Sequence, residues 1–140
     1  MNLSEAVYER MATDALLTSL VASYNGGPAI FTAQPVPDDA QLPFVVSVGQ
    51  VSGSVDVPET SKQRTGTRIV RDVRIYARAD GSYERIEAIA ERVWELFERQ
   101  MLTVTGWQSV RTRADRPVVI DNDGHIYGVV VSVSFAAVKE

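Results

Sequence analysis

The chain has 140 residues, enough for one domain that buries a hydrophobic core without covalent staples. It contains no cysteine, which excludes disulfides and thiolate chemistry, and 45% of its residues are hydrophobic, as in an ordinary globular protein. The net charge of −4 argues against a general nucleic-acid binder, because the chain as a whole would be repelled by phosphate.

The charge is divided unevenly along the chain. Residues 1–60 hold one basic residue, Arg10, against seven acids, whereas residues 61–80 hold six basic residues against two acids. Such asymmetry can fix the register between neighbouring subunits. The plainer interpretation is a solvated strand face whose arginines pair with neighbouring acids, and at this point both interpretations stay open.

The first predicted element is an amphipathic helix over about residues 3–22, because apolar residues recur there at helical spacing. Its start has early acids and no long apolar run, so we expect no signal peptide. No apolar stretch approaches the roughly 18 residues that span a bilayer, so we expect no membrane association. The motif YNGGP ends the helix; its glycines follow a helix rather than lead into one, which argues against a phosphate cradle.

Two strands and a long polar segment come next. Ala29–Ala33 is a short strand candidate, and the β-branched run Phe44–Val51 predicts a longer strand. The proline-rich segment between them is a loop. Ser52–Gly66 is long, polar and rich in turn formers, so we predict a long flexible loop at about 52–66, with a hairpin carrying an extended arm as the alternative.

The strand Thr67–Arg78 alternates between two kinds of side chain. One face is predicted to turn to the core and the other to solvent or a partner, because successive residues of a strand point to opposite sides. The core face holds Ile69, Val73, Ile75 and Ala77, with Arg71 as an exception, and the other face holds Arg68, Val70, Asp72, Arg74, Tyr76 and Arg78.

A second helix follows the turn at Asp80–Ser82. Its apolar stripe is Ile86, Ile89, Ala90, Val93, Phe97 and Met101, widened by Trp94. Trp107–Arg113 is a strand, and Val118–Ile120 either extends it or pairs separately. Ile126–Val138 gives the strongest strand pattern of the chain, so we expect it at the centre of the sheet. Tyr76 and Trp107 each remain open between core packing and an exposed aromatic anchor.

This order of elements predicts a single α+β domain over residues 1–140, an antiparallel β-sheet with two α-helices packed on one face.

No set of residues predicts catalysis or metal binding. The only histidine, His125, follows the turn DNDG, whose spacing does not fit a calcium loop because Val119 falls where the first carboxylate is needed. Asp38 and Asp39 are a possible carboxylate pair, but they lie between prolines, where Asp commonly bonds local amides. We therefore expect no catalytic, cofactor-binding or metal-binding residues, no cofactor and no enzymatic activity.

The order of motifs nevertheless resembles the tail-completion or tail-terminator family of tailed bacteriophages and prophages. The resemblance covers nearly the whole chain and rests on LPFVV (Leu42–Val46), on VRIYA running into an acidic turn and helix, and on the closing strand YGVVVSVSF. The family's last strand often begins with a basic residue, where this chain has Ile126 and Tyr127.

The resemblance implies a structural virion protein. Members form a ring, usually a hexamer, that caps the phage tail tube and joins it to the head–tail connector, with DNA passing through the centre only as cargo. Its partners would be copies of itself, the tail tube protein and the connector protein. It would assemble in the host bacterial cytoplasm and end in the virion tail.

A head-to-tail ring needs two different complementary patches on each subunit. We expect the basic segment to supply one patch and the acidic first helix the other. The candidate interface residues are Lys62, Arg64, Arg68, Arg74, Tyr76 and Arg78 on the basic side and Glu5 and Glu9 on the acidic side. The alternative function is a small non-enzymatic α+β module that binds a protein or ligand on its open sheet face or edge.

Overall fold

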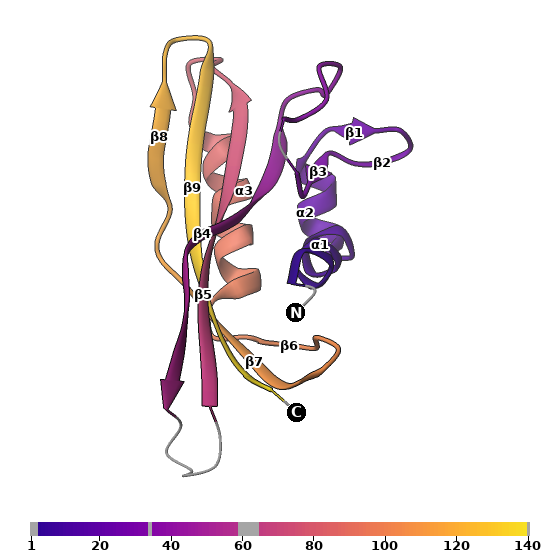
Figure 1. Ribbon diagram of the computed structural model, residues 1–140. Helices are drawn as coiled ribbons and strands as arrows, with labels where there is room; N and C mark the ends of the chain where they lie inside the picture. Colours follow the sequence, from indigo (N-terminus) through magenta and orange to yellow (C-terminus); the bar gives the residue numbers. More distant parts are fainter. Residues whose placement is uncertain (1–2, 34, 59–64, 140) are drawn as a thin grey trace.

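The computed structural model describes residues 3–33, 35–58 and 65–139 and shows a helical layer against a curled sheet (Figure 1). In this part of the chain the elements are α1 (Leu3–Ala12), α2 (Ala15–Leu20), β1 (Ser23–Tyr24), β2 (Gly27–Pro28), β3 (Ile30–Phe31), β4 (Phe44–Pro58), β5 (Thr65–Arg78), α3 (Glu84–Phe97), β6 (Met101–Leu102), β7 (Trp107–Ala114), β8 (Val118–Asn122) and β9 (Ile126–Lys139). The predicted α+β class is confirmed.

The last strand, β9, lies at the centre of the sheet, as predicted. Among the described residues the strand order is β3-β4-β5-β9-β7-β6, and β8 pairs with β9 beside the start of that strand. All pairs in this sheet are antiparallel except β3 with β4, which is parallel. Val118–Ile120 therefore belongs to a strand of its own, β8, one of the two possibilities left open by the sequence.

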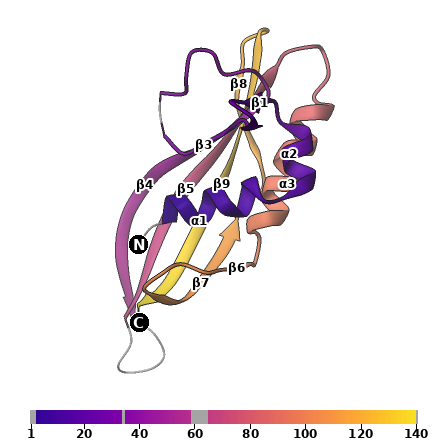
Figure 2. The same cartoon turned by 90° about the vertical axis from the view of Figure 1, so that its right-hand side faces the viewer.

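The helices lie on one face of the sheet, and the core fills the space between the two layers (Figure 2). The core side chains that come from the helices include Val7, Met11, Leu17, Ile89, Val93 and Phe97. Those that come from the sheet include Val73, Ile75, Val131, Val133 and Phe135. Each such side chain contributes about 1.5–3 kcal/mol when it is fully removed from water. The predicted inward face of β5 is thus a core face, and Val131, Val133 and Phe135 of β9 lie on the same side.

The single first helix predicted over residues 3–22 is wrong, because the helix is interrupted after Ala12. Asp14 adopts an extended backbone conformation and its carboxylate accepts the backbone N–H of Leu17 at 2.9 Å, which caps a separate helix, α2. Aspartate competes with the helix in this way when its side chain can bond nearby amides. After α2, Asn25 and Gly26 adopt positive φ and turn a small hairpin between β1 and β2.

The apolar stripe of α3 is confirmed except at its end. Ile86, Ile89, Ala90, Val93 and Phe97 are buried, but the helix ends at Phe97. Met101 lies instead in β6 with its side chain 61% exposed. The chain leaves the helix at Glu98, whose backbone is extended, and the positive φ of 52° at Arg99 then turns it toward β6.

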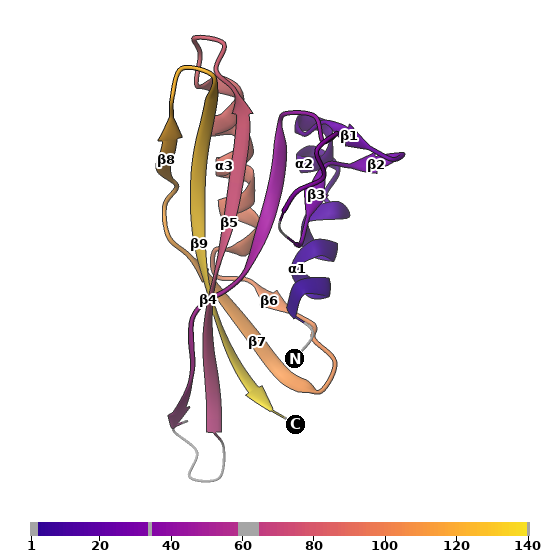
Figure 3. The ribbon, with the colours of Figure 1, turned by 45° about the horizontal axis from the view of Figure 1, so that its top comes forward.

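The strands β4 and β5 extend past the strand bounds predicted from the sequence, which agrees with the alternative of a hairpin that carries an extended arm. Residues Ser52–Pro58 and Thr65–Gly66, expected to belong to a long flexible loop, are paired in the antiparallel ladder. The two strands reach past the helical layer as an extended arm (Figure 3). The rest of the predicted loop, 59–64, lies outside the described residues, and its flexibility stays a prediction.

Candidate assembly surface

The outer face of the sheet, turned away from the helices, carries the arginines of β5. Val73, Ile75 and Ala77 are buried under the helices, so the alternating residues point the other way. Arg68 and Arg78 are exposed on this outer face, and Arg74 and Tyr76 are half-buried there. The structure therefore brings four of the candidate interface residues together, whereas Lys62 and Arg64 lie outside the described residues.

These outer arginines are not neutralised by the acids of the described chain. Arg68, Arg74 and Arg78 form no ion pair there, which argues against the plainer interpretation of a self-paired strand face. The nearby Asp72 instead accepts a hydrogen bond from the Ser132 hydroxyl at 2.7 Å. The positive charge of this face is thus available to a partner.

Arg71 is the exception that the sequence indicated. It points inward, and its Nη1 donates to the Ser4 hydroxyl of α1 at 2.8 Å. Burial lowers the pKa of its guanidinium, although arginine remains charged at neutral pH. Arg71 therefore ties β5 to the helical layer and takes no part in the outer surface.

Tyr76 packs into a row of aromatic rings. Its ring centroid lies 5.6 Å from that of Phe44, which is 5.9 Å from that of Phe31, which in turn is 5.3 Å from that of Tyr24. Gly128 on β9 makes room for this ring, since a Cβ there would lie 3.1 Å from Tyr76 Cε1. Tyr76 is therefore a packed residue of the outer face, partly accessible to a partner.

Strand β7 adds two arginines that the sequence analysis did not single out. Val110 and Thr112 are buried, so Arg111 and Arg113 point to the outer face, where both are exposed. Ala136 of β9 pairs with Arg68 on one side and with Arg111 on the other. The sequence did contain one signal for these two residues, the alternation of Arg111 and Arg113 with apolar or small residues. It contained no signal that they lie beside Arg68.

The outer face is hollowed where these arginines meet. A groove of about 620 Å³ lies over β5, β9 and β7, next to the turn that follows α3. Its lining includes Arg68, Arg99, Met101, Arg111, Arg113 and Ala136, with Asp115 as the acid. We call it the arginine groove.

The helical layer on the other side is acidic. In α1, α2 and α3 there are six glutamates and three arginines, and all six glutamates are exposed. Glu5 and Glu9 lie on α1, opposite its buried stripe. The two candidate acids therefore lie on the layer opposite to the outer arginines of β5, Arg68, Arg74 and Arg78.

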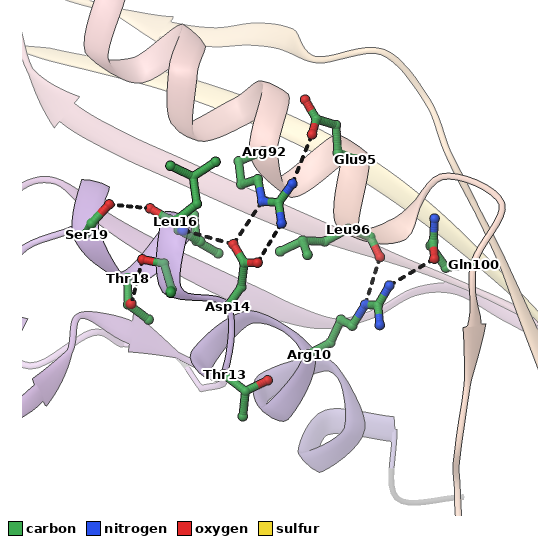
Figure 4. A network of polar contacts seen from close by, with 12 residues as sticks. Arg10, Thr13, Asp14, Leu16, Thr18, Ser19, Arg92, Glu95, Leu96 and Gln100 are labelled. Atoms are coloured by element: carbon green, nitrogen blue, oxygen red, sulfur yellow. Dashed lines mark hydrogen bonds and ion pairs between the residues drawn. The ribbon is translucent and has the colours of Figure 1, made fainter.

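Two of the three arginines of this layer, Arg10 and Arg92, are directed into the structure, whereas Arg85 is exposed. Arg92 donates from Nε and Nη2 to Asp14, at 2.9 Å and 2.6 Å, and Arg10 donates from Nε to the Leu96 carbonyl at 3.1 Å (Figure 4). Asp14 has a pKa below its ordinary value, first because of the hydrogen bond from Arg92. These contacts join α1 and α2 to α3.

The residues considered for other chemistry have structural tasks. His125 is exposed in the turn before β9, and Asp123 Oδ1 accepts the backbone N–H groups of His125 and Ile126 at 2.8 Å each. Asp39 accepts the Tyr24 hydroxyl at 3.0 Å. Over residues 3–33, 35–58 and 65–139, no three His, Asp or Glu side chains are grouped to hold a metal ion.

Among the described residues, no helix is both long and apolar enough to cross a lipid bilayer.

The fold is shared with known structures, although no protein-family model matches the sequence and no curated protein matches it. One similar chain belongs to a solved structure described as the virion of a native gene transfer agent particle; it is 18% identical, the match covers 99% of this chain and 95% of that one, and the TM-score is 0.68. A second solved structure, whose name states no function, is 12% identical with a TM-score of 0.57 over 96% of this chain and 92% of that one. At these identities the likeness concerns the fold, which this chain shares over nearly its full length with a chain of a gene transfer agent virion.

Proposed function

We propose that this chain is a structural protein of a phage-like virion. The observation that carries the proposal is the fold shared, over 99% of this chain and 95% of the other, with a chain from the virion of a gene transfer agent. A match that covers almost all residues of both chains indicates that they share one architecture over that length. The sequence resemblance to phage proteins supports the same function independently.

Within such a particle, the finer role we propose is that of a tail terminator without enzymatic activity. Copies of the chain form a ring, a hexamer by the resemblance, which caps the tail tube and contacts the head–tail connector. DNA passes through the ring as cargo. Assembly takes place in the host bacterial cytoplasm, and the product resides in the virion tail.

The distribution of charge supports a head-to-tail ring. Such a ring joins two different surfaces of neighbouring subunits, and each subunit must carry both. Here the outer sheet face carries Arg68, Arg74 and Arg78, which form no ion pair with the residues that the structure describes, while the exposed acids Glu5 and Glu9 lie on the helical side. Opposite charges on opposite sides favour stacking in one direction and disfavour contacts between like faces.

Reversing the basic strand face tests this arrangement. The double variant Arg74→Glu and Arg78→Glu is expected to lose assembly at low salt, since two attractive contacts per interface become repulsive. The measurement is molar mass by light scattering across protein concentration, with negative-stain microscopy to detect rings or stacked discs.

The matched control is the double variant Arg74→Lys and Arg78→Lys, which keeps the charge and should still assemble. A wild-type mass that stays monomeric at every concentration and salt would overturn the ring and favour the small binding module. Unchanged assembly of the glutamate variant would show that these two arginines are not part of the interface.

A further inference from the structure

The arginine groove is built by the register of four strands. Arg68 on β5 pairs with Ala136 on β9, Ala136 pairs with Arg111 on β7, and Arg111 pairs with Met101 on β6. Neighbouring strands are about 4.8 Å apart, so Arg68 and Arg111 start about 10 Å apart across a small residue. The alanine leaves a floor over which both guanidinium groups can reach one ligand.

A second row of the sheet repeats this arrangement. Ser134 on β9 pairs with Val70 on one side and with Arg113 on the other, so a small side chain again lies beside an arginine. Arg99 joins from the turn after α3, its Nε lying 3.9 Å from Glu98 Oε1. Within the described chain, Arg68, Arg111 and Arg113 form no ion pair, so the groove keeps an excess of positive charge over Asp115, the acid in its lining.

The chemistry of the lining favours carboxylates of a protein over phosphates of a nucleic acid. Guanidinium groups bind both carboxylates and phosphates through two parallel hydrogen bonds, so the other residues of the groove and the charge of the chain decide between them. The basic residues of the groove are all arginines, and an exposed methionine, Met101, lies at its edge; arginine and methionine are enriched in protein interfaces, and lysine is depleted. The net charge of −4 opposes the approach of a polyanion such as DNA.

The chain itself carries a matching acidic surface. Glu84, Glu87 and Glu91 are exposed on α3 at spacings of three and four residues, which places them on one side of the helix. Glu84 and Glu87 have no ion-pair partner in the part of the chain that the structure describes, and Glu91 meets only the exposed Arg116 at 3.5 Å. Helix α3 lies on the face of the sheet opposite to the groove, so one copy cannot fill its own groove.

We propose that the arginine groove receives the glutamates of α3 from a second copy of this chain. This inference rests on the proposed function and extends the subunit contact beyond Arg74 and Arg78. The added residues are Arg68, Arg99, Arg111 and Arg113 on one subunit, and Glu84, Glu87 and Glu91 on the next. Because the two surfaces lie on opposite sides of each subunit, the contact repeats head to tail.

Two variants with opposite charge reversals test the contact. Arg68→Glu with Arg111→Glu makes the groove acidic, and Glu87→Arg with Glu91→Arg makes the helix basic. Each variant alone is expected to raise the concentration for half-assembly at least about tenfold, because each interface then brings like charges together. Molar mass by light scattering at low salt is the measurement, and circular dichroism verifies folding.

Mixing the two variants in equal amounts supplies the decisive readout. The acidic groove of one variant faces the basic helix of the other, and the reverse contact is the wild-type pair, so alternating subunits should assemble again. Asp38→Arg, compared with Glu87→Arg alone, is the matched control: Asp38 is exposed in the loop before β4, outside both the groove and α3, and its reversal should leave assembly unchanged. If a glutamate variant does not fold, Arg68→Gln with Arg111→Gln replaces it.

The outcomes separate this inference from the function on which it rests. A wild-type chain that never assembles overturns the proposed function. A wild-type chain that assembles, together with a groove variant that assembles equally well, overturns only the inference. Folded variants whose mixture stays dissociated would show that α3 is not the occupant. A groove variant with normal mass but weaker retention on duplex DNA would assign the groove to phosphate.

Discussion

Asp14 performs two tasks with one carboxylate. It caps α2 through the Leu17 amide and binds Arg92 of α3 through two hydrogen bonds. Its side chain is 14% exposed and that of Arg92 is 27% exposed, so the pair is shielded more than a surface ion pair. The break in the first helix is therefore also the point at which that helix pair is attached to α3.

Replacing Asp14 by Asn separates the two tasks. Asparagine caps a helix about as well as aspartate, so the variant loses mainly the charge that Arg92 contacts. We expect the free energy of unfolding near pH 7 to fall by about 1–2 kcal/mol. Urea unfolding of the wild type and the variant measures the difference.

The pH dependence of this difference follows from the lowered pKa of Asp14. Its pKa in the folded state lies below the ordinary value of 3.8 that it has when unfolded, chiefly because Arg92 donates to it. The stabilisation is therefore present above pH 3.8 and is lost as the pH falls through the lowered pKa. The difference between wild type and variant should shrink below that pH; a constant difference would mean that the charge is not its cause. Asp39→Asn, at an exposed acid, is the control and should change stability little.

Thr112 connects β7 to the end of α3 through hydrogen bonds. Its buried hydroxyl donates to the Phe97 carbonyl at the end of α3 and accepts the Gln100 amide at 3.2 Å. The backbone groups at the end of α3 have no partners within the helix, and these bonds supply partners for them. The position of α3 on the sheet, and of Arg99 beside the groove, thus depends on β7.

Thr112→Val removes the hydroxyl and keeps the shape of the side chain. We expect it to lower the free energy of unfolding by about 1–3 kcal/mol, because buried backbone groups are left without partners. Thermal and urea unfolding measure the loss. Thr103→Val, at an exposed threonine, is the control; an equal effect at both positions would contradict the role given to the Thr112 hydroxyl.

The two layers of the molecule carry opposite charges: the helical layer is acidic, and β5 and β7 of the sheet are basic. The helices carry six glutamates against three arginines, whereas β5 and β7 carry six arginines against one aspartate. Two of the three helix arginines, Arg10 and Arg92, bind the Leu96 carbonyl and Asp14, and the exposed Arg85 donates to the Leu20 carbonyl. Arg68, Arg111 and Arg113 have no ion-pair partner among the described residues. A subunit of this kind is suited to ordered stacking of opposite faces.

Assembly through such faces should weaken as salt is added. Between about 0.1 M and 1 M sodium chloride the screening length falls from about 10 Å to about 3 Å, which reduces attraction between charges that stay partly hydrated. We expect the concentration for half-assembly to rise over this range, measured by light scattering. Assembly that is unchanged or strengthened by salt would point to an apolar interface instead.

The sequence by itself determined the elements whose side chains repeat locally. The inward faces of β5 and β9 and the stripe of α3 follow from periods of two and about 3.6 residues, which neighbouring residues alone impose. The α+β class and the central position of β9 were predicted from the same patterns. The end of α3 and the bounds of the β4–β5 arm were not predicted. For the arm, the reason is that pairing with distant residues decides where a strand continues.

The tertiary structure alone decided what lies beside what. Asp14 ends a helix and finds its partner in Arg92, 78 residues away, which no local pattern encodes. Arg68 and Arg111 become neighbours in a groove only because both pair with Ala136, and Gly128 accommodates Tyr76 only because β5 and β9 are in register. The physical reason is that sheet register depends on how the whole core packs, whereas a side chain's face depends only on its own strand.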